Sequence, residues 1–167
     1  GSNYVWTWET NRVLRDIVTN SGGRILAERL LELGDTTVDH IVREIIDRKP
    51  PVVFNTLVGE SSYVFMRLLH AATLRSGLTI PVLSCSLCEP ELKLIGPAAS
   101  VGCITSSAYF ESIERPENSA FVARWKARHG DDSQPCVDGL STYVCVMLLA
   151  RAIRRAGSVE VGAVRRA

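Results

Sequence analysis

Two cysteines, Cys85 and Cys88, form a C-x-x-C pair directly after a short apolar run. A thiol at the start of a helix has a lowered pKa, which suits disulfide exchange. Thioredoxin-like proteins, however, carry this pair early and before a long helix. Here the pair lies in the middle of the chain, and only a short helix can begin at Pro90. The sequence therefore favours thiols that line or support a loop, and thiol exchange remains an alternative that requires a lowered thiol pKa.

Other residue types that could carry out catalysis are isolated from one another. Gly59-Glu60-Ser61 resembles part of a nucleophile elbow, but Tyr63 stands where that motif has its second glycine. We interpret Ser61 as a helix cap, and His40 and His70 as structural histidines beside apolar stripes. The remaining cysteines and histidines are scattered singly, so no zinc-ligand spacing is present. The sequence predicts a protein that is not an enzyme and that holds no metal.

Composition excludes further classes of function. Neither a G-x-G-x-x-G sequence nor a P-loop is present, so no nucleotide cofactor is predicted. The 19 basic and 18 acidic residues nearly cancel, which disfavours direct binding of nucleic acid. We interpret the C-terminal arginines (Arg151, Arg154, Arg155, Arg165 and Arg166) as a solvated helix face. No apolar run reaches the ~20 residues that cross a bilayer, so no membrane insertion is expected. The five cysteines, an odd number, favour reduced thiols in a cytoplasmic protein.

Aromatic residues occupy alternate positions near the start of the chain, at Tyr4, Trp6 and Trp8. An extended segment would place all three rings on one side. Apolar rings that displace water, with a few hydroxyl or amide groups, form the kind of wall that a small neutral ligand needs. The alternative is a staple that holds the N-terminal segment to the rest of the domain.

The elements that must position these residues alternate between helix and strand. Apolar residues at a 3.6-residue period predict helices over residues 9–20, 38–46, 61–77, 117–129 and 137–156, with a short helix beginning at Pro90. Short apolar runs predict strands over residues 24–33, 52–57, 80–84 and 101–109. This order predicts an α/β protein: an open, three-layer Rossmann-like or flavodoxin-like lobe with a mainly parallel sheet.

Ligands of such sheets bind at the carboxyl ends of the strands. This rule nominates residues 4–8, 55–60, 84–89 and 109–115 as the loops that face a crevice. We expect residues 1–157 to form a single ligand-binding lobe of a two-lobe protein. Residues 158–167 begin another helix-like stretch, which we expect to lie at the boundary with a further part of that protein.

Several segments, in this order, resemble one family. They are residues 1–6, Thr10-Asn11-Arg12-Val13, Gly22-Gly23, residues 53–59, residues 109–116 and residues 119–122. Together they are similar to the C-terminal lobe of type I periplasmic-binding-protein relatives, and most similar to the amide-sensing negative regulators of aliphatic amidase expression. Transport receptors for urea and short amides resemble the chain nearly as well.

The resemblance implies a non-catalytic sensor lobe that closes on a short aliphatic amide. It implies ligand contacts by the aromatic loop (Tyr4 and Trp6), by the second loop (Thr56 and Val58) and by the third loop (Ser84 and Ser86). In a regulator the ligand-free protein would sequester an antiterminator in the cytoplasm; a homo-oligomer is possible. The alternative is an extracytoplasmic lipoprotein receptor of an ABC importer for urea, amides or branched-chain amino acids. Trp6 and Thr7 depart from the family's usual tyrosine and proline, and Glu89 could hold an amino-acid ammonium group.

The resemblance also implies a central strand that leads directly into Gly1. Two strands without that neighbour would have unpaired backbone edges, which are costly when buried. We therefore expect upstream residues, residues 4–8 or another copy of the chain to pair with these edges.

Overall fold

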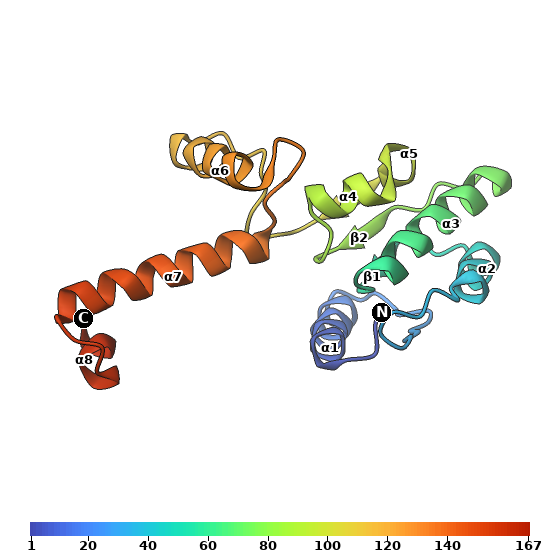
Figure 1. The fold of residues 1–167 in the computed structure, drawn as a ribbon. Coiled ribbons are helices and arrows are strands. Elements are labelled where there is room, and N and C mark those ends of the chain that lie inside the picture. Colours follow the sequence, from blue (N-terminus) through green and yellow to red (C-terminus); the bar gives the residue numbers. More distant parts are fainter. The chain divides into compact units, whose positions relative to one another are not determined.

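A computed structural model describes residues 1–167. The chain divides into two compact units, Gly1–Ser107 and Ala108–Ala167, which are described separately here. Figure 1 shows the elements of both units along the chain. The six side chains nominated as ligand contacts lie in the first unit, whereas the nominated loop of residues 109–115 lies in the second.

The first unit is built on a parallel sheet of three short strands. They are β1 (Val53–Asn55), β2 (Val82–Ser84) and β3 (Cys103–Thr105), in the order β1-β2-β3. Phe54 lies opposite Leu83, and Leu83 lies opposite Ile104. Proline precedes two of these strands, at Pro51 and Pro81, which suits a residue at the start of a strand. The predicted α/β fold with a parallel open sheet is confirmed.

Five helices belong to this unit. They are α1 (Val5–Asn20), α2 (Asp39–Arg48), α3 (Glu60–Ser76), α4 (Glu89–Ile95) and α5 (Pro97–Ser100). Gly77 adopts the left-handed conformation (φ 63°) that ends α3, where a residue with a side chain would be strained. Helix α3 packs against α2, α4 and α5 (Figure 1). The apolar periodicity correctly predicted α2 and α3.

The apolar core lies between this helical layer and the sheet. Its fully covered members come from the sheet and from the helices packed on it: Leu31, Val38, Val42, Leu57, Phe65, Met66, Leu69, Ala72, Val82, Leu87, Ile95 and Ala99. Because side chains alternate along a strand, Val82 enters this core, whereas its neighbour Leu83 faces the other side of the sheet. Phe54 and Leu83 remain only half-buried. One face of the sheet is therefore packed more completely than the other.

Two predicted segments differ in the structure. Residues 24–33 do not form a strand; they contribute only an isolated parallel bridge between Ser2 and Leu31. A strand requires a regular series of hydrogen bonds to a neighbour, whereas only Arg29 and Leu31 of this segment form backbone hydrogen bonds with the chain start. Residues 4–8 are not extended either, because α1 begins at Val5. They therefore do not pair with the strand edges that the missing central strand would leave open. Strand β3 (Cys103–Thr105) is also shorter than the predicted range 101–109.

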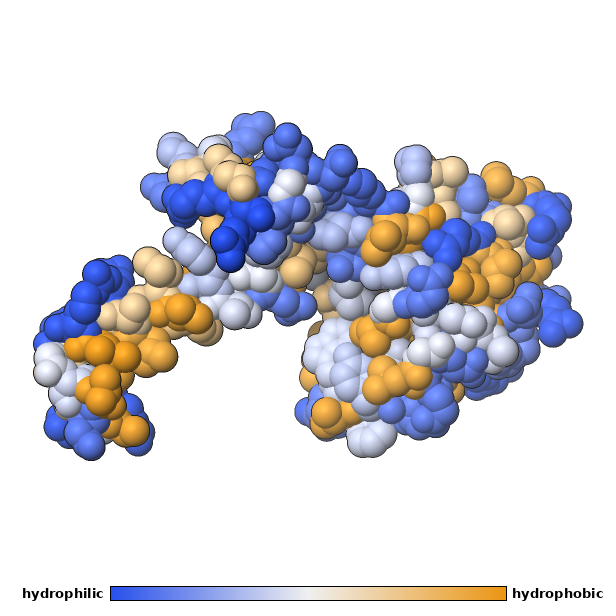
Figure 2. Space-filling view, viewed as in Figure 1, coloured by the Kyte–Doolittle hydropathy of each residue, from blue (hydrophilic) through white to orange (hydrophobic).

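The second unit consists of α6 (Pro116–His129), α7 (Val137–Ala156) and α8 (Val161–Arg166). Its small core is aromatic: the Phe121 ring lies 5.2 Å from Tyr143 and 6.2 Å from Tyr109, measured between centroids. Val146 and Leu148 of α7 are exposed, and Figure 2 shows apolar residues gathered along α7 and α8. None of the helices combines the length and the apolar character needed to span a bilayer.

Candidate functional site at the carboxyl ends of the strands

The turn that leaves β1 is fixed by the buried side chain of Asn55. Its Nδ2 donates to Ser62 Oγ at 2.9 Å, and its Oδ1 accepts from the Leu57 backbone N–H at 2.9 Å. This local bond to a residue two positions later is an Asx turn, which holds the chain out of the strand and into α3. Asn55 is 3% exposed, so solvent cannot replace these bonds.

The segment that precedes α1 is attached to the same turn. The Ser2 backbone N–H donates to the Thr56 carbonyl at 3.2 Å, and Ser2 Oγ accepts from the Val58 N–H at 3.1 Å. Thr7, in the first turn of α1, also donates its hydroxyl to the Thr56 carbonyl, at 3.3 Å. Ser2 and Thr7 are fully buried. The chain start and the loop after β1 therefore form one hydrogen-bonded unit.

The loop after β2 joins this unit through two hydroxyl groups. Ser84 Oγ donates to the Asn55 carbonyl at 3.1 Å and accepts from the Ser86 N–H at 3.2 Å. Ser86 Oγ donates to the Leu57 carbonyl at 3.3 Å. We call Ser2, Thr56, Ser84 and Ser86 the hydroxyl network. Its members come from three segments that are far apart in the sequence and meet at one edge of the sheet.

Two aromatic rings lie beside the network. Tyr4 is the last extended residue before α1, and its ring stacks on Trp6 with centroids 6.1 Å apart and planes 29° apart. Burial raises the pKa of the Tyr4 phenol, and the neighbouring Cys85 thiol raises it further. The Tyr4 backbone N–H donates to the Ser2 carbonyl at 3.0 Å, which attaches Tyr4 to the segment that carries Ser2. Trp8 is 51% exposed and donates to Asn3 Oδ1, so the prediction of three rings in one wall is wrong.

The six nominated residues lie around the start of α1, in the turn after β1, and at the end of β2 and in the loop that follows it, and their environments differ. Thr56 is 1% exposed and donates its hydroxyl to Asn11 Oδ1 at 3.1 Å, so it holds the loop to α1. The Val58 N–H is bonded to Ser2. Tyr4, Trp6 and Ser86 are half-buried and remain reachable from solvent. Sequence reasoning missed Ser2 and, although it nominated the loop of residues 55–60, did not single out Asn55; a polar Asn inside an apolar strand run was the available signal for the second.

No lysine or arginine takes part in the hydrogen bonds of the network. The nearest charged groups along the chain are at the starts of α3 and α4. Glu60 is exposed and forms an ion pair with Arg67 at 2.8 Å. Glu89 is half-buried as the first residue of α4, three positions after Ser86. No group of three or more His, Cys, Asp or Glu side chains in residues 1–167 is arranged to hold a metal ion. The site is thus built from uncharged groups.

The C-x-x-C pair supports a loop. None of the five cysteines forms a disulfide, and burial raises the pKa of Cys85. Cys88 is buried as the N-cap of α4, where its backbone N–H donates to Glu91 Oε2 at 2.8 Å. A thiol with a raised pKa is a poorer nucleophile at neutral pH, because less of it is thiolate. This argues against disulfide exchange.

We expect alkylation to distinguish these thiols. Cys145 is exposed on α7, whereas burial raises the pKa of both Cys85 and Cys103. Near neutral pH, iodoacetamide should modify Cys145 first and the two half-buried thiols more slowly, because a raised pKa leaves less of each thiol as thiolate. Peptide mass spectrometry of a time course measures this, with Cys145→Ser as the control. Modification of Cys85 as fast as Cys145 would restore the thiol-exchange alternative.

The fold and the site define a class: an α/β lobe whose uncharged loops converge at the carboxyl ends of parallel strands. The whole chain, residues 1–167, matches the periplasmic binding protein domain, and the chain belongs to this family. It has the type I fold of that family. The predicted family resemblance is confirmed at this level.

Solved structures with the same fold are transport proteins. A solute-binding protein of an ABC transporter from R. palustris, in complex with benzoate, is 21% identical with a TM-score of 0.84, over 98% of this chain and 44% of that one. A putative branched-chain amino acid ABC transporter protein from Rhodospirillum rubrum is 24% identical, with a TM-score of 0.73, over 99% and 47%. A leucine binding protein from Thermotoga maritima is 22% identical, with a TM-score of 0.70, over 92% and 43%.

This chain therefore spans less than half the length of each of these structures. The neighbours are binding proteins rather than enzymes, in agreement with the absence of a predicted catalytic pair. They support the receptor alternative better than the regulator of amidase expression, and none of them supports an antiterminator partner.

Proposed function

We propose that this chain is a ligand-binding lobe of a solute-binding receptor for an ABC importer, and that its solute is a small, uncharged polar molecule such as urea or a short aliphatic amide. The observation that carries the proposal is the hydroxyl network, which joins three loops at one edge of the sheet through hydroxyl, amide and carbonyl groups alone. Tyr4, whose ring stacks on that of Trp6, is hydrogen-bonded through its backbone N–H to Ser2 of this network.

The chemistry of the network suits a carboxamide. A carboxamide offers two N–H donors and one carbonyl acceptor, and hydroxyl groups can both donate and accept. A carboxylate solute is instead bound most strongly by cations or by several charge-assisted donors. Because no lysine or arginine joins the network, we expect it to prefer an amide over an anion such as benzoate. The faces of Tyr4 and Trp6 would cover the short alkyl part.

One lobe supplies half of a binding cleft. Ligand sites bury most of a small ligand's surface, and the half-buried Ser86 and Tyr4 leave this edge open on one side. We expect a second lobe to close over the solute, which requires tighter binding to the closed state than to the open one. A receptor of this kind would act outside the cytoplasm. An amide-responsive regulator would use the same network inside it.

Branched-chain amino acids are the second candidate, because of Glu89. Its half-buried carboxylate follows the loop of Ser84 and Ser86 and could pair with a ligand ammonium group. The two candidates differ in their dependence on this charge. Glu89→Gln should leave amide binding within about twofold, but should weaken an amino acid that relies on the carboxylate by about tenfold or more.

Titration calorimetry on the two-lobe protein that contains this chain tests the proposal. The affinities of acetamide, butyramide, urea, leucine and benzoate are measured for the protein with the original sequence and for the Ser86→Ala variant. Losing one hydroxyl contact should weaken amide binding about fivefold, equivalent to ~1 kcal/mol. Ser76→Ala, an exposed serine at the end of α3, is the matched control and should change nothing. Binding of leucine or benzoate without any amide would overturn the proposal.

A further inference from the structure

The hydroxyl network limits which hydrogen-bonding groups it can offer to a solute. A hydroxyl group has one proton to donate and two lone pairs that accept. Three members of the network are covered: Ser2, Thr56 and Ser84 are each at most 3% exposed. Ser86 is half-buried, so its hydroxyl is the one in the network that a solute can reach. The direction in which Ser86 donates its proton therefore decides what this hydroxyl can bind.

The proton of Ser84 is committed to the backbone. Ser84 Oγ donates to the Asn55 carbonyl at 3.1 Å, and a carbonyl oxygen can only accept. Ser84 Oγ also accepts from the Ser86 N–H at 3.2 Å. Because its single proton is on the bond to Asn55, Ser84 can only accept in its 3.3 Å contact with Ser86 Oγ.

The proton of Ser86 therefore stays inside the network. Its two acceptors are the Leu57 carbonyl and Ser84 Oγ, each 3.3 Å from Ser86 Oγ. Leu57 is 4% exposed, so water does not readily replace this bond if Ser86 turns its proton outward. Because the hydrogen bonds end at the backbone carbonyls of Asn55 and Leu57, the direction of donation is fixed. Ser86 is left with an acceptor lone pair for a solute.

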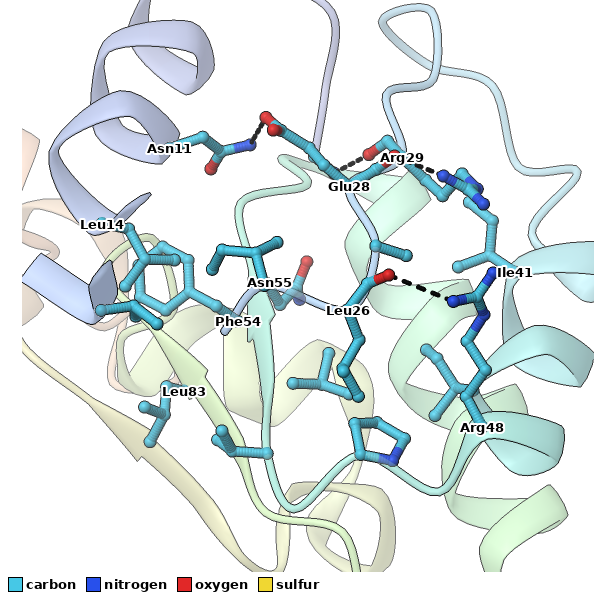
Figure 3. A pocket seen from close by; sticks show the side chains of 18 of the residues that line it. Asn11, Leu14, Leu26, Glu28, Arg29, Ile41, Arg48, Phe54, Asn55 and Leu83 are labelled. Carbon is cyan, nitrogen blue, oxygen red and sulfur yellow. Dashed lines mark hydrogen bonds between the residues drawn. The ribbon is translucent and has the colours of Figure 1, made fainter. Parts of the chain in front are cut away.

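The hydroxyl of Thr56 also donates inward, toward α1. Its acceptor is Asn11 Oδ1, at 3.1 Å. Asn11 Nδ2 in turn donates to Glu28 Oε1 at 2.9 Å, as Figure 3 shows. This hydrogen bond lowers the pKa of the Glu28 carboxyl, which is therefore an ionised acceptor near neutral pH. Because the carboxylate holds the amide nitrogen of Asn11, the amide oxygen is the atom that faces Thr56.

The neighbouring backbone donors are occupied as well. The N–H groups of Leu57, Val58 and Ser86 all donate to side-chain oxygens of the site, at 2.9, 3.1 and 3.2 Å. The N–H groups of these residues and the hydroxyl protons of Thr56, Ser84 and Ser86 are thus used within the protein. The network keeps accepting capacity at the half-buried Ser86.

We infer that Ser86 binds an N–H group of the solute, and that the solute's carbonyl group is directed away from this hydroxyl. The inference rests on the proposed function, because it concerns the orientation of the solute at the same edge of the sheet. Primary and secondary amides and urea carry the N–H group that an acceptor needs. A ketone or a tertiary amide has the carbonyl group alone and gains nothing from Ser86.

Acetamide and acetone distinguish an N–H contact from a carbonyl contact. Both have a carbonyl group and nearly the same shape, but acetone has a methyl group where acetamide has its NH2 group. Titration calorimetry on the two-lobe protein that contains this chain gives the ratio of the two affinities, with weak binding measured by displacement. In Ser86→Ala we expect acetamide to bind about fivefold more weakly and acetone to be unchanged, so the ratio should fall about fivefold. N-methylacetamide and N,N-dimethylacetamide, which differ in one N–H group, should repeat this result.

Two further variants serve as controls. Ser86→Thr keeps the hydroxyl and should keep the ratio within about twofold. Ser76→Ala removes an exposed serine outside the network and should leave the ratio unchanged. If Ser86 instead donated to the carbonyl group, Ser86→Ala would weaken all these solutes equally. An unchanged ratio would therefore overturn this inference and leave the amide proposal intact, whereas binding of leucine or benzoate without any amide would overturn both.

Discussion

Replacing Asn55 with alanine is expected to lower the free energy of unfolding of the first unit by about 3 kcal/mol. The substitution removes the shared partner of two buried hydrogen bonds, leaving the Leu57 N–H and the Ser62 hydroxyl without the bonds they make to Asn55. Ser62 is fully buried and Leu57 is 4% exposed, so each lost bond costs about 1–3 kcal/mol. Urea denaturation, followed by hydrogen exchange of the β2 amides, reports on this unit alone.

The same substitution should also reduce solute binding, because the Asx turn sets the path of the loop that carries Val58. Asn20→Ala, at the exposed end of α1, removes an asparagine that makes no such bond and is the control, with an expected change within ~0.5 kcal/mol. A loss below about 1 kcal/mol for Asn55→Ala would mean that the turn is held by other contacts.

Replacing Phe65 with alanine should be the most destabilising single change in α3. Phe65 is 3% exposed in the core between α3 and the sheet, and truncating a buried phenylalanine costs about 3–5 kcal/mol through lost transfer energy and the cavity left behind. The urea midpoint of the β2 amides measures the effect.

Leu74→Ala is the matched control for this core substitution. It truncates an apolar residue of the same helix that is 68% exposed, and should change stability by at most about 0.5 kcal/mol. Similar losses for Phe65→Ala and Leu74→Ala would contradict the placement of the core on one side of α3.

The sequence predicted the elements whose pattern is local. The stripe of Val38, Val42 and Ile45 at helical spacing identifies α2, and the β-branched run at Val53 identifies β1. The prediction of a strand over residues 24–33 was wrong because a strand depends on a hydrogen-bonded neighbour, which no local sequence pattern reveals. The prediction that Tyr4, Trp6 and Trp8 lie on one side of an extended segment was wrong for a different reason. Alternate positions suit an extended chain, but residues four apart, such as Tyr4 and Trp8, also share a face of a helix.

The candidate site was partly predictable in the same sense. Ser84 and Ser86 follow an apolar run, so the rule for parallel sheets places them at the ligand-binding edge. Nothing local in the sequence shows that Ser2 bonds to Val58, 56 residues away. Thr56 was expected to contact ligand through its hydroxyl; the structure bonds that hydroxyl to Asn11, and its contact with a ligand remains a prediction.

An edge made of hydroxyls, backbone amides and carbonyls has nothing to titrate in the physiological range. Serine and threonine hydroxyls stay neutral, and because the pKa of Tyr4 is raised above its ordinary value of 10.0, its phenol keeps its proton through mildly alkaline conditions. An uncharged solute likewise carries no counterions that salt could displace. A receptor built this way would capture its cargo equally well in acidic or neutral surroundings and in fresh or saline water.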